Sequence, residues 1–444
     1  MTEKLTKADG LPARDATTRL RTRTVLKLLL ATLTTVLPIY AIAGNAFYLV
    51  GYGIESELMG GADAAVSRDA FAANNNPSGL TQISGQMAEF DVAGYLHLEA
   101  SHTDAFNNYR KPITNGIGGF GNGAYARHIE GTPFSAGAAL VVQGGIGWVY
   151  SGLNTAFGTR DDASALFAII KLAPAVAWEI NDKLSVGLGL GVNYLSATQE
   201  LFPNTSNPAF AGFRFKGASG VGLSSKLGLQ YRPANDVTIG VTYGTQTSIP
   251  LKDGTLRVNF SDPAFGSMGV VRYDNAKLTG MRLPEELAIG IAFRPTDRLL
   301  VSLEDKWFNW SDAIGTIYLS ATNPRTPGAP SVIALPPAVA KFNDQHVIKV
   351  GAAYLWDKDN TLYFGINHGS RPQPDQYVNP IFAPIQARHY TFGAKHQIDN
   401  EWETAGGVEV LALQSVTYDN PLFGPRANER HFGLIFFASI GRHW

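Results

Sequence analysis

The sequence predicts an all-β membrane protein, a 14-stranded antiparallel transmembrane β-barrel plugged by a small N-terminal hatch. Three observations predict this fold. Apolar and polar residues alternate over many short stretches, as in strands with one apolar face. Charged residues make up only 16% of a chain that contains 47 glycines, whereas soluble domains carry about 25% charged residues. Short polar turns also alternate with long irregular stretches, which is typical of outer-membrane barrels.

The first 43 residues have the layout of a secretory signal peptide. Arg19, Arg21 and Arg23 lead into an apolar run, residues 28–37, and a small-residue cleavage signal ends at Ala43. We expect the mature chain to begin directly after Ala43. An uncleaved membrane anchor is the alternative, but the apolar run is shorter than the ~20 residues that a spanning helix needs. No other stretch reaches that length, which excludes spanning helices from the rest of the chain.

Residues 44–85 are the expected hatch, because this stretch is rich in small residues and does not alternate. Residues 62–73 are expected to form a short helix, since alanine is the best helix former. Asn76-Pro77-Ser78 then predicts a turn just before the first alternating stretch. A compact segment without strands at the head of a barrel fits inside the lumen. An Asn-Pro pair by itself more often marks only a turn, and that interpretation stays open.

Residues 86–444 are the expected barrel. In residues 184–194 the even positions are all apolar or aromatic, and the odd positions are serine, glycine or asparagine. Because successive side chains of a strand point to opposite faces, one face is wholly apolar. The other face carries glycines and few charges, which fits a small-residue lumen better than the charged exterior of a soluble sandwich.

The number of strands follows from the turns. Six short polar breaks separate alternating stretches, as tight hairpin turns do. If both chain ends lie on the same side, six turns require seven loops on the other side and therefore fourteen strands. The six breaks are residues 144–145, 181–183, 233–236, 295–297, 357–360 and 399–400. The expected loops are residues 101–133, 152–164, 201–215, 251–279, 313–344, 370–387 and 418–429.

The C-terminal end has the form of an outer-membrane assembly signal. Trp444 is an aromatic last residue, and Phe436, Ala438 and Ile440 alternate before it. The barrel-assembly machinery is therefore an expected partner. Arg442 interrupts the apolar series where a hydrophobic residue is the usual choice.

These motifs together resemble the outer-membrane long-chain fatty acid transporters and toluene-uptake porins (FadL type). The resemblance covers nearly the whole mature chain. It rests on the aromatic start at Phe47, the small-residue stretch that follows, and the Asn76-Pro77-Ser78 tripeptide. Two further blocks carry it, residues 174–184 and the Leu283-Pro284-Glu285 step that opens a strand. It implies a passive, monomeric outer-membrane channel for hydrophobic small molecules, surrounded by outer-membrane lipid and lipopolysaccharide.

The resemblance also implies where the site lies. Ligand is expected in a pocket against the start of the hatch, at Phe47, Tyr48 and Leu49, before the hatch shifts. It is then expected to leave sideways through the barrel wall beside a kinked strand. Gly144, Gly145 and Gly147 are expected to begin the third strand and to supply the kink, because glycine weakens strands and marks bends. Pro174, on the expected fourth strand, cannot donate to the ladder and is a second candidate.

The substrate stays open at this point. A fatty acid carboxylate needs a buried cation as its partner, whereas a hydrocarbon does not. The candidate cations are Lys171, Lys226 and Lys349. Residues 332–339 are unusually apolar for a loop. They would serve either as a first capture surface for ligand or as a cap that packs on neighbouring loops.

The sequence offers little for other functions. It has no cysteine and a net charge of −1, and no histidine pair stands at metal-ligand spacing, so we expect no metal, no cofactor and no nucleic-acid partner. Residues 116–121 match GxGxxG, but no strand precedes them and no helix follows. The remaining alternatives are a polar-solute porin, a barrel that adheres through its loops, and an outer-membrane lipid hydrolase. Lipid-ester hydrolysis by the purified protein would identify the last of these, and removal of the hatch would barely change an open porin.

Overall fold

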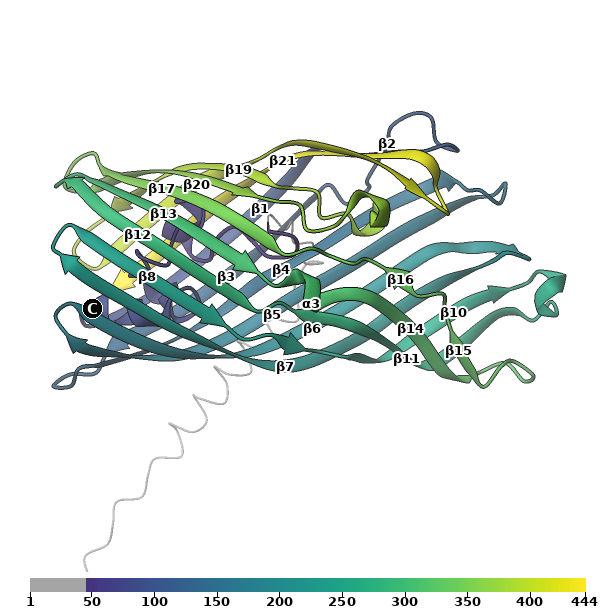
Figure 1. Ribbon diagram of the computed structural model, residues 1–444, viewed down its shortest axis with the longest axis horizontal. Coiled ribbons are helices and arrows are strands. Elements are labelled where there is room, and N and C mark those ends of the chain that lie inside the picture. Colours follow the sequence, from purple (N-terminus) through teal and green to yellow (C-terminus); the bar gives the residue numbers. More distant parts are fainter. Residues whose placement is uncertain (1–44) are drawn as a thin grey trace, which may run out of the picture. The chain divides into compact units, whose positions relative to one another are not determined.

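The computed structural model describes residues 45–444, and Figure 1 shows them as a β-barrel with the start of the chain inside it. The expected signal peptide, residues 1–43, and its cleavage site lie outside the described residues. Within residues 45–444, no helix is long and apolar enough to cross a membrane.

The barrel wall has fourteen antiparallel strand positions, as predicted, and it closes where β1 pairs with β21. Single strands occupy most positions: β1 (Gln86–Thr103), β3 (Ile117–His128), β4 (Phe134–Asn154), β5 (Arg160–Asn181), β6 (Leu184–Asn207), β7 (Phe210–Ala234), β17 (Gln345–Leu355), β18 (Asn360–Gly369), β19 (Arg388–Gln397), β20 (Trp402–Asn420) and β21 (Gly424–His443). Three positions are each shared by two consecutive strands: β8 (Val237–Gly244) and β10 (Leu251–Phe260), β11 (Gly269–Leu283) and β12 (Glu286–Thr296), β13 (Leu299–Phe308) and β14 (Ile314–Pro324). The short strands are β2 (Lys111–Pro112), β9 (Thr247–Ser248), β15 (Val332–Ala334) and β16 (Ala338–Val339).

The alternating pattern places apolar side chains on the outside of the barrel. On β6, Leu188, Leu190 and Val192 are exposed, whereas Ser185 and Asn193 of the opposite face are buried. The outer face of the barrel is therefore apolar where it meets lipid, as a membrane barrel requires.

Five of the six predicted turns connect neighbouring strands, and the turn at Gly144-Gly145 is wrong. Both glycines lie in the middle of β4, and the first short turn is residues 129–133. The glycine-rich stretch at residues 116–123 is part of the loop predicted at residues 101–133. Most of it instead belongs to β3, which pairs with β1 through its backbone although its side chains are small.

The strands also extend further toward the long-loop side than predicted. Most of residues 201–215 and 251–279 belong to β6, β7, β10 and β11. Their outward positions carry charged instead of apolar side chains, such as Lys216 and Arg257. Beyond the apolar belt, the polarity pattern that marks a membrane strand is lost while the backbone pairing continues.

The hatch occupies the lumen. Its elements are α2 (Ile54–Leu58) and the 3₁₀ turns η1 (Ala70–Ala73) and η2 (Pro77–Gln82), and nearly every residue from 45 to 80 is buried. The predicted helix over residues 62–73 is wrong except for its last turn. Barrel side chains bind the backbone there instead: the Ala64 amide donates to Glu304 Oε2 at 2.8 Å. The Ala64 carbonyl, which in a helix would accept from the Arg68 amide, accepts instead from Gln230 Nε2 of β7 at 3.3 Å, so a wall side chain replaces an intrahelical hydrogen bond.

The end of the lumen that carries the long hairpins is filled by barrel side chains. Phe202, Phe215 and Tyr273 are fully buried there in one apolar cluster that continues down to the hatch. The helical elements outside the hatch are η3 (Pro263–Phe265), α3 (Trp310–Ala313), η4 (Asp375–Tyr377) and η5 (Pro380–Phe382).

The chain end lies at the closing seam of the barrel. Trp444 exchanges backbone hydrogen bonds with Gln86, at 3.0 and 2.9 Å, next to the start of β1. The Arg442 guanidinium lies 5.3 Å from the ring of Trp444 and 5.2 Å from that of Trp402, and it pairs with Glu401 at 2.9 Å. These contacts explain how Arg442 fits at a position where the pattern favours an apolar residue.

Deletion of Trp444 is expected to lower the amount of protein in the outer membrane by roughly tenfold, because the closing bonds and the terminal aromatic ring are lost together. Heat-modifiable protein in outer-membrane fractions measures this. Trp444→Phe keeps an aromatic end and should assemble normally. Full yield of the chain that ends at His443 would contradict the role of Trp444.

Candidate ligand pocket and wall interruption

The first residues of the hatch form a short arm, residues 45–52, whose Phe47 side chain is enclosed by aromatic rings. The ring centroids of Phe167, Trp310, Phe342 and Phe382 lie 5.7, 5.4, 5.7 and 4.9 Å from that of Phe47. We call these four residues the aromatic cage. The cage is assembled from β5, α3, the segment before β17 and η5. It encloses a phenyl ring that belongs to the protein itself.

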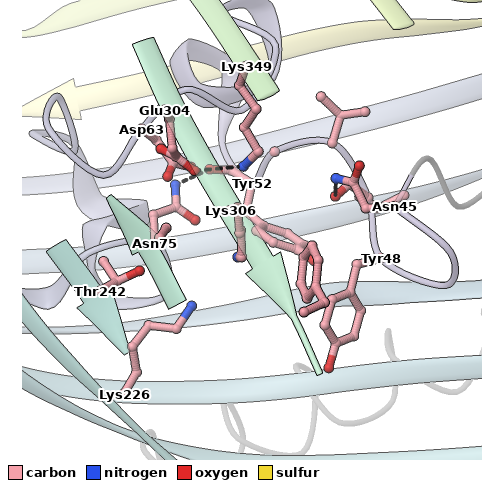
Figure 2. Close-up of a pocket in the computed structure, with 15 residues that line it drawn as sticks. Asn45, Tyr48, Tyr52, Asp63, Asn75, Lys226, Thr242, Glu304, Lys306 and Lys349 are labelled. Carbon is pink, nitrogen blue, oxygen red and sulfur yellow. Dashed lines mark hydrogen bonds and ion pairs between the residues drawn. The ribbon is translucent and has the colours of Figure 1, made fainter. Parts of the chain in front are cut away.

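Next to the cage, a small polar pocket lies under the arm, and Figure 2 shows the residues that line it. Tyr48 and Leu49 contribute to its arm side. Its other side holds charged groups that neutralise one another: Lys349 Nζ lies 2.9 Å from Glu304 Oε1 and also donates to the Gly61 carbonyl at 2.8 Å. These bonds fasten the body of the hatch to β13 and β17.

The three lysines that the sequence singled out differ in their partners. Lys226 pairs with Glu286 at 2.6 Å, and Lys349 pairs with Glu304. Lys171 is 7% exposed, and its ammonium group makes no ion pair or hydrogen bond within residues 45–444. It lines a second small pocket together with Tyr48. Lys171 is therefore the cation of this group that is available to a ligand.

The barrel wall is interrupted where the arm meets β4. β3 begins at Ile117, but its pairing with β4 stops at Gly123↔Leu140. Near this point β4 carries one extra residue, Gln143, because the register with β5 shifts between Val142 and Gly144. Such a bulge bends a strand. We call this stretch, where β3 and β4 are not paired, the wall interruption.

The arm bonds to β4 beside the wall interruption. The Gly145 amide donates to the Phe47 carbonyl at 2.8 Å, and Tyr48 forms an isolated antiparallel β-bridge with Gly144. A Cβ at Gly144 would lie 1.8 Å from the Phe47 carbonyl oxygen, so only glycine allows this approach. A Cβ at Gly147 would lie 2.4 Å from the Leu166 side chain. The three glycines are thus in the third strand of the wall, as expected, but in its middle instead of at its start.

Two asparagines that the sequence did not single out satisfy the β4 backbone near the wall interruption. The Val142 amide donates to Asn122 Oδ1 at 2.8 Å. Asn115 Nδ2 donates to the Gly147 carbonyl at 3.0 Å, and its Oδ1 accepts from the Val149 amide at 3.1 Å. No local motif marks these side chains, because their partners are more than 15 residues away.

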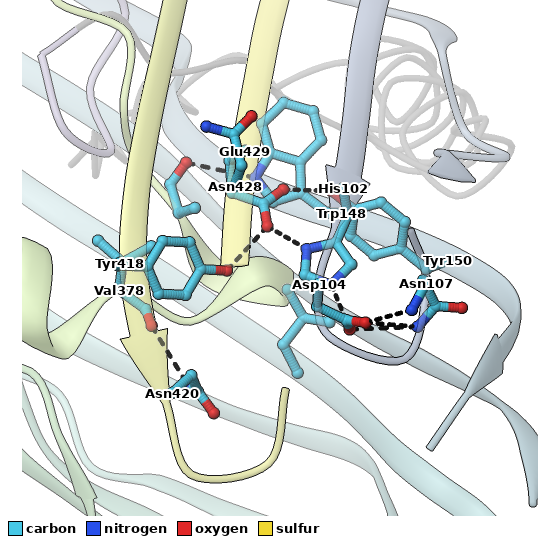
Figure 3. A network of polar contacts seen from close by, with 12 residues as sticks. His102, Asp104, Asn107, Trp148, Tyr150, Val378, Tyr418, Asn420, Asn428 and Glu429 are labelled. Carbon is cyan, nitrogen blue, oxygen red and sulfur yellow. Dashed lines mark hydrogen bonds and ion pairs between the residues drawn. The ribbon is translucent and has the colours of Figure 1, made fainter. Parts of the chain in front are cut away.

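Beyond the wall interruption, a buried polar network fastens the first long loop, as Figure 3 shows. His102 lies between two carboxylates, with Nδ1 2.5 Å from Glu429 Oε1 and Nε2 2.8 Å from Asp104 Oδ2. The hydroxyls of Tyr150 and Tyr418 both donate to Glu429 at 2.8 Å. β1, β4, β20 and β21 are joined here, which limits the wall interruption on the side of the long loops.

Pro174 lies on β5, the fourth strand of the wall, as expected. The pairing of β5 with β6 passes from Leu172↔Val192 to Ala175↔Gly189 and omits the two residues between. On the other side, Pro174 keeps its place opposite Ala138 in β4. The register with β6 is the same on both sides of this gap, so Pro174 adds no extra residue to its strand, unlike Gln143.

Asn76 joins the hatch to the wall. Its Nδ2 donates to the Ala64 carbonyl at 2.6 Å and to the Leu229 carbonyl of β7 at 3.3 Å. Its Oδ1 accepts from the amide and the hydroxyl of Ser78, at 3.2 and 2.8 Å. Pro77 begins η2, and all three residues of the tripeptide are buried.

Replacing Asn76 and Pro77 together with alanine is expected to leave a folded, heat-modifiable barrel with altered uptake of hydrophobic compounds and altered single-channel conductance. A buried amide that loses its partners costs ~1–3 kcal/mol, enough to loosen a hatch but too little to unfold a barrel. Uptake of a labelled fatty acid or aromatic hydrocarbon and planar-bilayer conductance would measure this. If both match the wild type at equal abundance, the tripeptide is only a turn.

The apolar loop stretch divides between its two expected roles. Ile333 and Leu335 pack partly buried against the core cluster, whereas Val332 is 61% exposed. β15 pairs with β14 and holds the stretch against the wall. One side of it therefore covers the barrel, and the other presents apolar surface to the exterior.

A fourteen-stranded barrel with an apolar outer wall and a buried hatch defines the class of the protein: it is a transport channel of the bacterial outer membrane. The chain belongs to the family of outer membrane protein transport proteins OMPP1/FadL/TodX, whose model matches residues 45–422. It is thus an integral outer-membrane channel for hydrophobic substrates, and the family is a transport family and not an enzyme family.

Solved structures share the fold. The toluene transporter TodX of P. putida matches with a TM-score of 0.73 and 18% identity, covering 89% of this chain and 99% of that one. The toluene transporter TbuX of Ralstonia pickettii matches with a TM-score of 0.69 and 18% identity, over 89% and 99% of the two chains. A FadL homologue of Pseudomonas aeruginosa gives 0.66 and 16%, over 92% and 99%. No relative among the curated proteins matches the chain.

Proposed function

We propose that the protein takes up hydrophobic small molecules by passive diffusion, that the ligand gates the channel by displacing the hatch arm, and that it leaves sideways through the wall interruption. The observation that carries this proposal is the place of Phe47. Its ring fills the aromatic cage, while its carbonyl accepts from the β4 backbone beside the wall interruption. A ligand that takes the cage must move the same residue that covers the wall.

The cage suits either an aromatic ring or an alkyl chain. Lys171 adds a feature that a hydrocarbon would not need. Its ammonium group is buried, has no partner within the described chain, and lines a small pocket with Tyr48, the residue next to Phe47. A carboxylate there would form a charge-assisted bond in a dry site. We therefore propose long-chain fatty acids as the first substrate class. Aromatic or aliphatic hydrocarbons are the second, because the cage already holds a phenyl group.

Lateral release would deliver the ligand into lipid and keep a poorly soluble molecule out of the periplasm. The lumen is filled by apolar side chains at one end and by the hatch at the other, which does not favour the alternative of a polar-solute porin. We further propose that the barrel works as a monomer, that the barrel-assembly machinery inserts it, and that lipopolysaccharide surrounds it.

Deleting Gln143 tests the lateral route. Without the extra residue, β4 can pair regularly with β5 and extend its ladder along β3, which would close the wall. Uptake of a labelled fatty acid or toluene in cells is expected to fall by roughly tenfold, at unchanged barrel abundance. Gln143→Ala keeps the extra residue and is the matched control. Unchanged uptake after the deletion would show that ligand does not pass through this part of the wall.

A further inference from the structure

Three arginines lie side by side across adjacent strands of the outer wall. Arg257 of β10 is directly opposite Arg214 of β7 on one side and Arg272 of β11 on the other. We call these three residues the arginine row. Like charges directly opposite each other destabilise a sheet, so such a row requires compensation by anions.

The arginine row faces outward. The neighbouring residues Phe215, Leu256 and Tyr273 are fully buried and belong to the apolar cluster inside the barrel. Because side chains alternate between the two faces of a strand, the adjacent arginines point away from the lumen. Arg257 and Arg272 are indeed exposed.

Carboxylates of the chain neutralise the row only in part. Glu200 pairs with Arg214 at 3.0 Å but also with Lys216 at 2.6 Å. Asp274 likewise serves two cations, Arg272 at 2.9 Å and Arg325. Four cations therefore share two carboxylates in this patch, and Arg257 is a fifth cation beside them.

Arg257, at the centre of the row, has no ion pair or hydrogen bond from its guanidinium to any residue of the described chain. The nearest other charges on β10 are Lys252 and Asp253, which are both exposed and offset each other. The patch as a whole thus keeps an excess of positive charge centred on Arg257.

The row also lies at a defined height on the wall. Along β7 toward the periplasmic turn, Arg214 is followed by Lys216 and the small residues 217–220, and then by the strongly exposed apolar side chains of Val221, Leu223 and Leu227. The arginine row therefore lies above the apolar belt, on the side of the long hairpins, and polar or small residues such as Lys277 of β11 lie between the two. In an outer-membrane barrel this is the side of the outer leaflet, whose polar headgroups lie above the apolar belt.

We propose that the arginine row binds the phosphate groups of lipopolysaccharide, the phosphorylated lipid of the outer leaflet. Arginine binds phosphate bidentately through its planar fork of donors, and it suits sites beside an apolar surface because it is weakly hydrated. The acyl chains of the same lipid would lie on the apolar belt below. This inference rests on the outer-membrane location and is independent of the transport route.

The test measures lipid bound to the purified full-length mature protein in detergent. The probe is diphosphoryl lipid A, with dephosphorylated lipid A, phosphatidylglycerol and inorganic phosphate as competitors. We expect the variant with Arg214→Gln, Arg257→Gln and Arg272→Gln to bind diphosphoryl lipid A roughly tenfold more weakly than wild type. Arg298→Gln changes an exposed arginine of a short turn and is the matched control, expected to bind as wild type.

Arg257→Gln alone guards against a folding defect, because no ion pair of the described chain is broken by it. It should weaken lipid A binding while heat-modifiability stays normal. Equal binding by wild type and both variants would overturn the proposal. So would equal competition by phosphatidylglycerol, which would indicate a site for any anionic lipid. Displacement by millimolar inorganic phosphate alone would indicate a simple anion site and would overturn it as well.

Discussion

Replacing Phe47 with alanine is expected to tighten the binding of a small hydrophobic ligand by roughly tenfold, which corresponds to about 1.4 kcal/mol. In the wild-type protein a ligand has to displace the Phe47 ring from the aromatic cage before it can enter. A site that is occupied by the protein's own side chain has a lower apparent affinity, because only the open fraction can bind. With alanine at this position the aromatic cage would be empty, and a ligand could bind without displacing a side chain.

The physical basis is the fit of the cage around Phe47. Trp310 and Phe382 approach its ring to 5.4 and 4.9 Å, and Phe47 itself is 1% exposed. Removing a fully buried phenylalanine ring typically costs roughly 3–5 kcal/mol, because an apolar cavity remains. Such cavities stay dry and accept apolar ligands of matching size. A bound hydrophobe would recover much of the lost packing.

Fluorescence of Trp310, which lies in the cage, can report ligand binding directly. Phe342→Ala is the informative comparison, since it removes a cage wall that packs on Phe47 at 5.7 Å and should weaken binding instead. Affinity of Phe47→Ala equal to or weaker than that of wild type would show that the ring does not compete with ligand.

The barrel was predictable from sequence because its signals are local. Alternation on β6 and polar turns such as residues 181–183 depend only on neighbouring positions. The start of the hatch at Phe47 follows from a resemblance, whereas the glycines of β4 are predicted in the third strand because a turn is expected at Gly144-Gly145. The wrong turn and the correct strand are therefore both predicted from the same two glycines. Glycine there serves a close approach of the arm, and sequence alone cannot distinguish that use from a turn.

The rest of the site could not be predicted because its parts come from distant segments. Phe47 meets Trp310, Phe342 and Phe382 only after the barrel has closed around the hatch. None of the three stands in a motif. The helix predicted at residues 62–73 of the hatch does not form for a related reason, since the Gln230 side chain of the wall bonds a backbone carbonyl that the helix would use. Long-range packing overrode local propensity at both places.

The two glutamates of hatch helix α2 lie in opposite electrostatic surroundings. Both are buried, but Glu55 pairs with Arg68 at 2.5 Å, whereas neither carboxylate oxygen of Glu57 has a hydrogen-bond partner within residues 45–444. Burial raises the pKa of Glu57 well above its usual value, and the carboxylates of Asp91, Glu409 and Glu89 raise it further. Glu409 is itself bonded to His389 at 2.6 Å.

For Glu55, burial alone would raise the pKa, but Arg68 and Lys395 outweigh it, and the pKa is lowered. The two groups therefore affect the seating of the hatch with opposite signs. The raised pKa of Glu57 favours the seated hatch below about pH 4.3, the value in a released hatch, and this contribution is lost as the pH rises. The contribution of Glu55 is present above about pH 4.3 and is lost as the pH falls through its lowered pKa.

Glu57→Gln is accordingly expected to protect the hatch at neutral pH, by roughly tenfold in the rate of limited proteolysis, since a buried carboxylate without partners costs at least ~1–3 kcal/mol. The rate for wild type should rise from about pH 4 to about pH 8, and the substitution should flatten this rise. Glu55→Gln, two residues away on the same helix, should instead expose the hatch at neutral pH, because Arg68 loses its partner. Identical pH profiles for wild type and Glu57→Gln would mean that neighbouring carboxyl groups, and not Glu57, take up the proton.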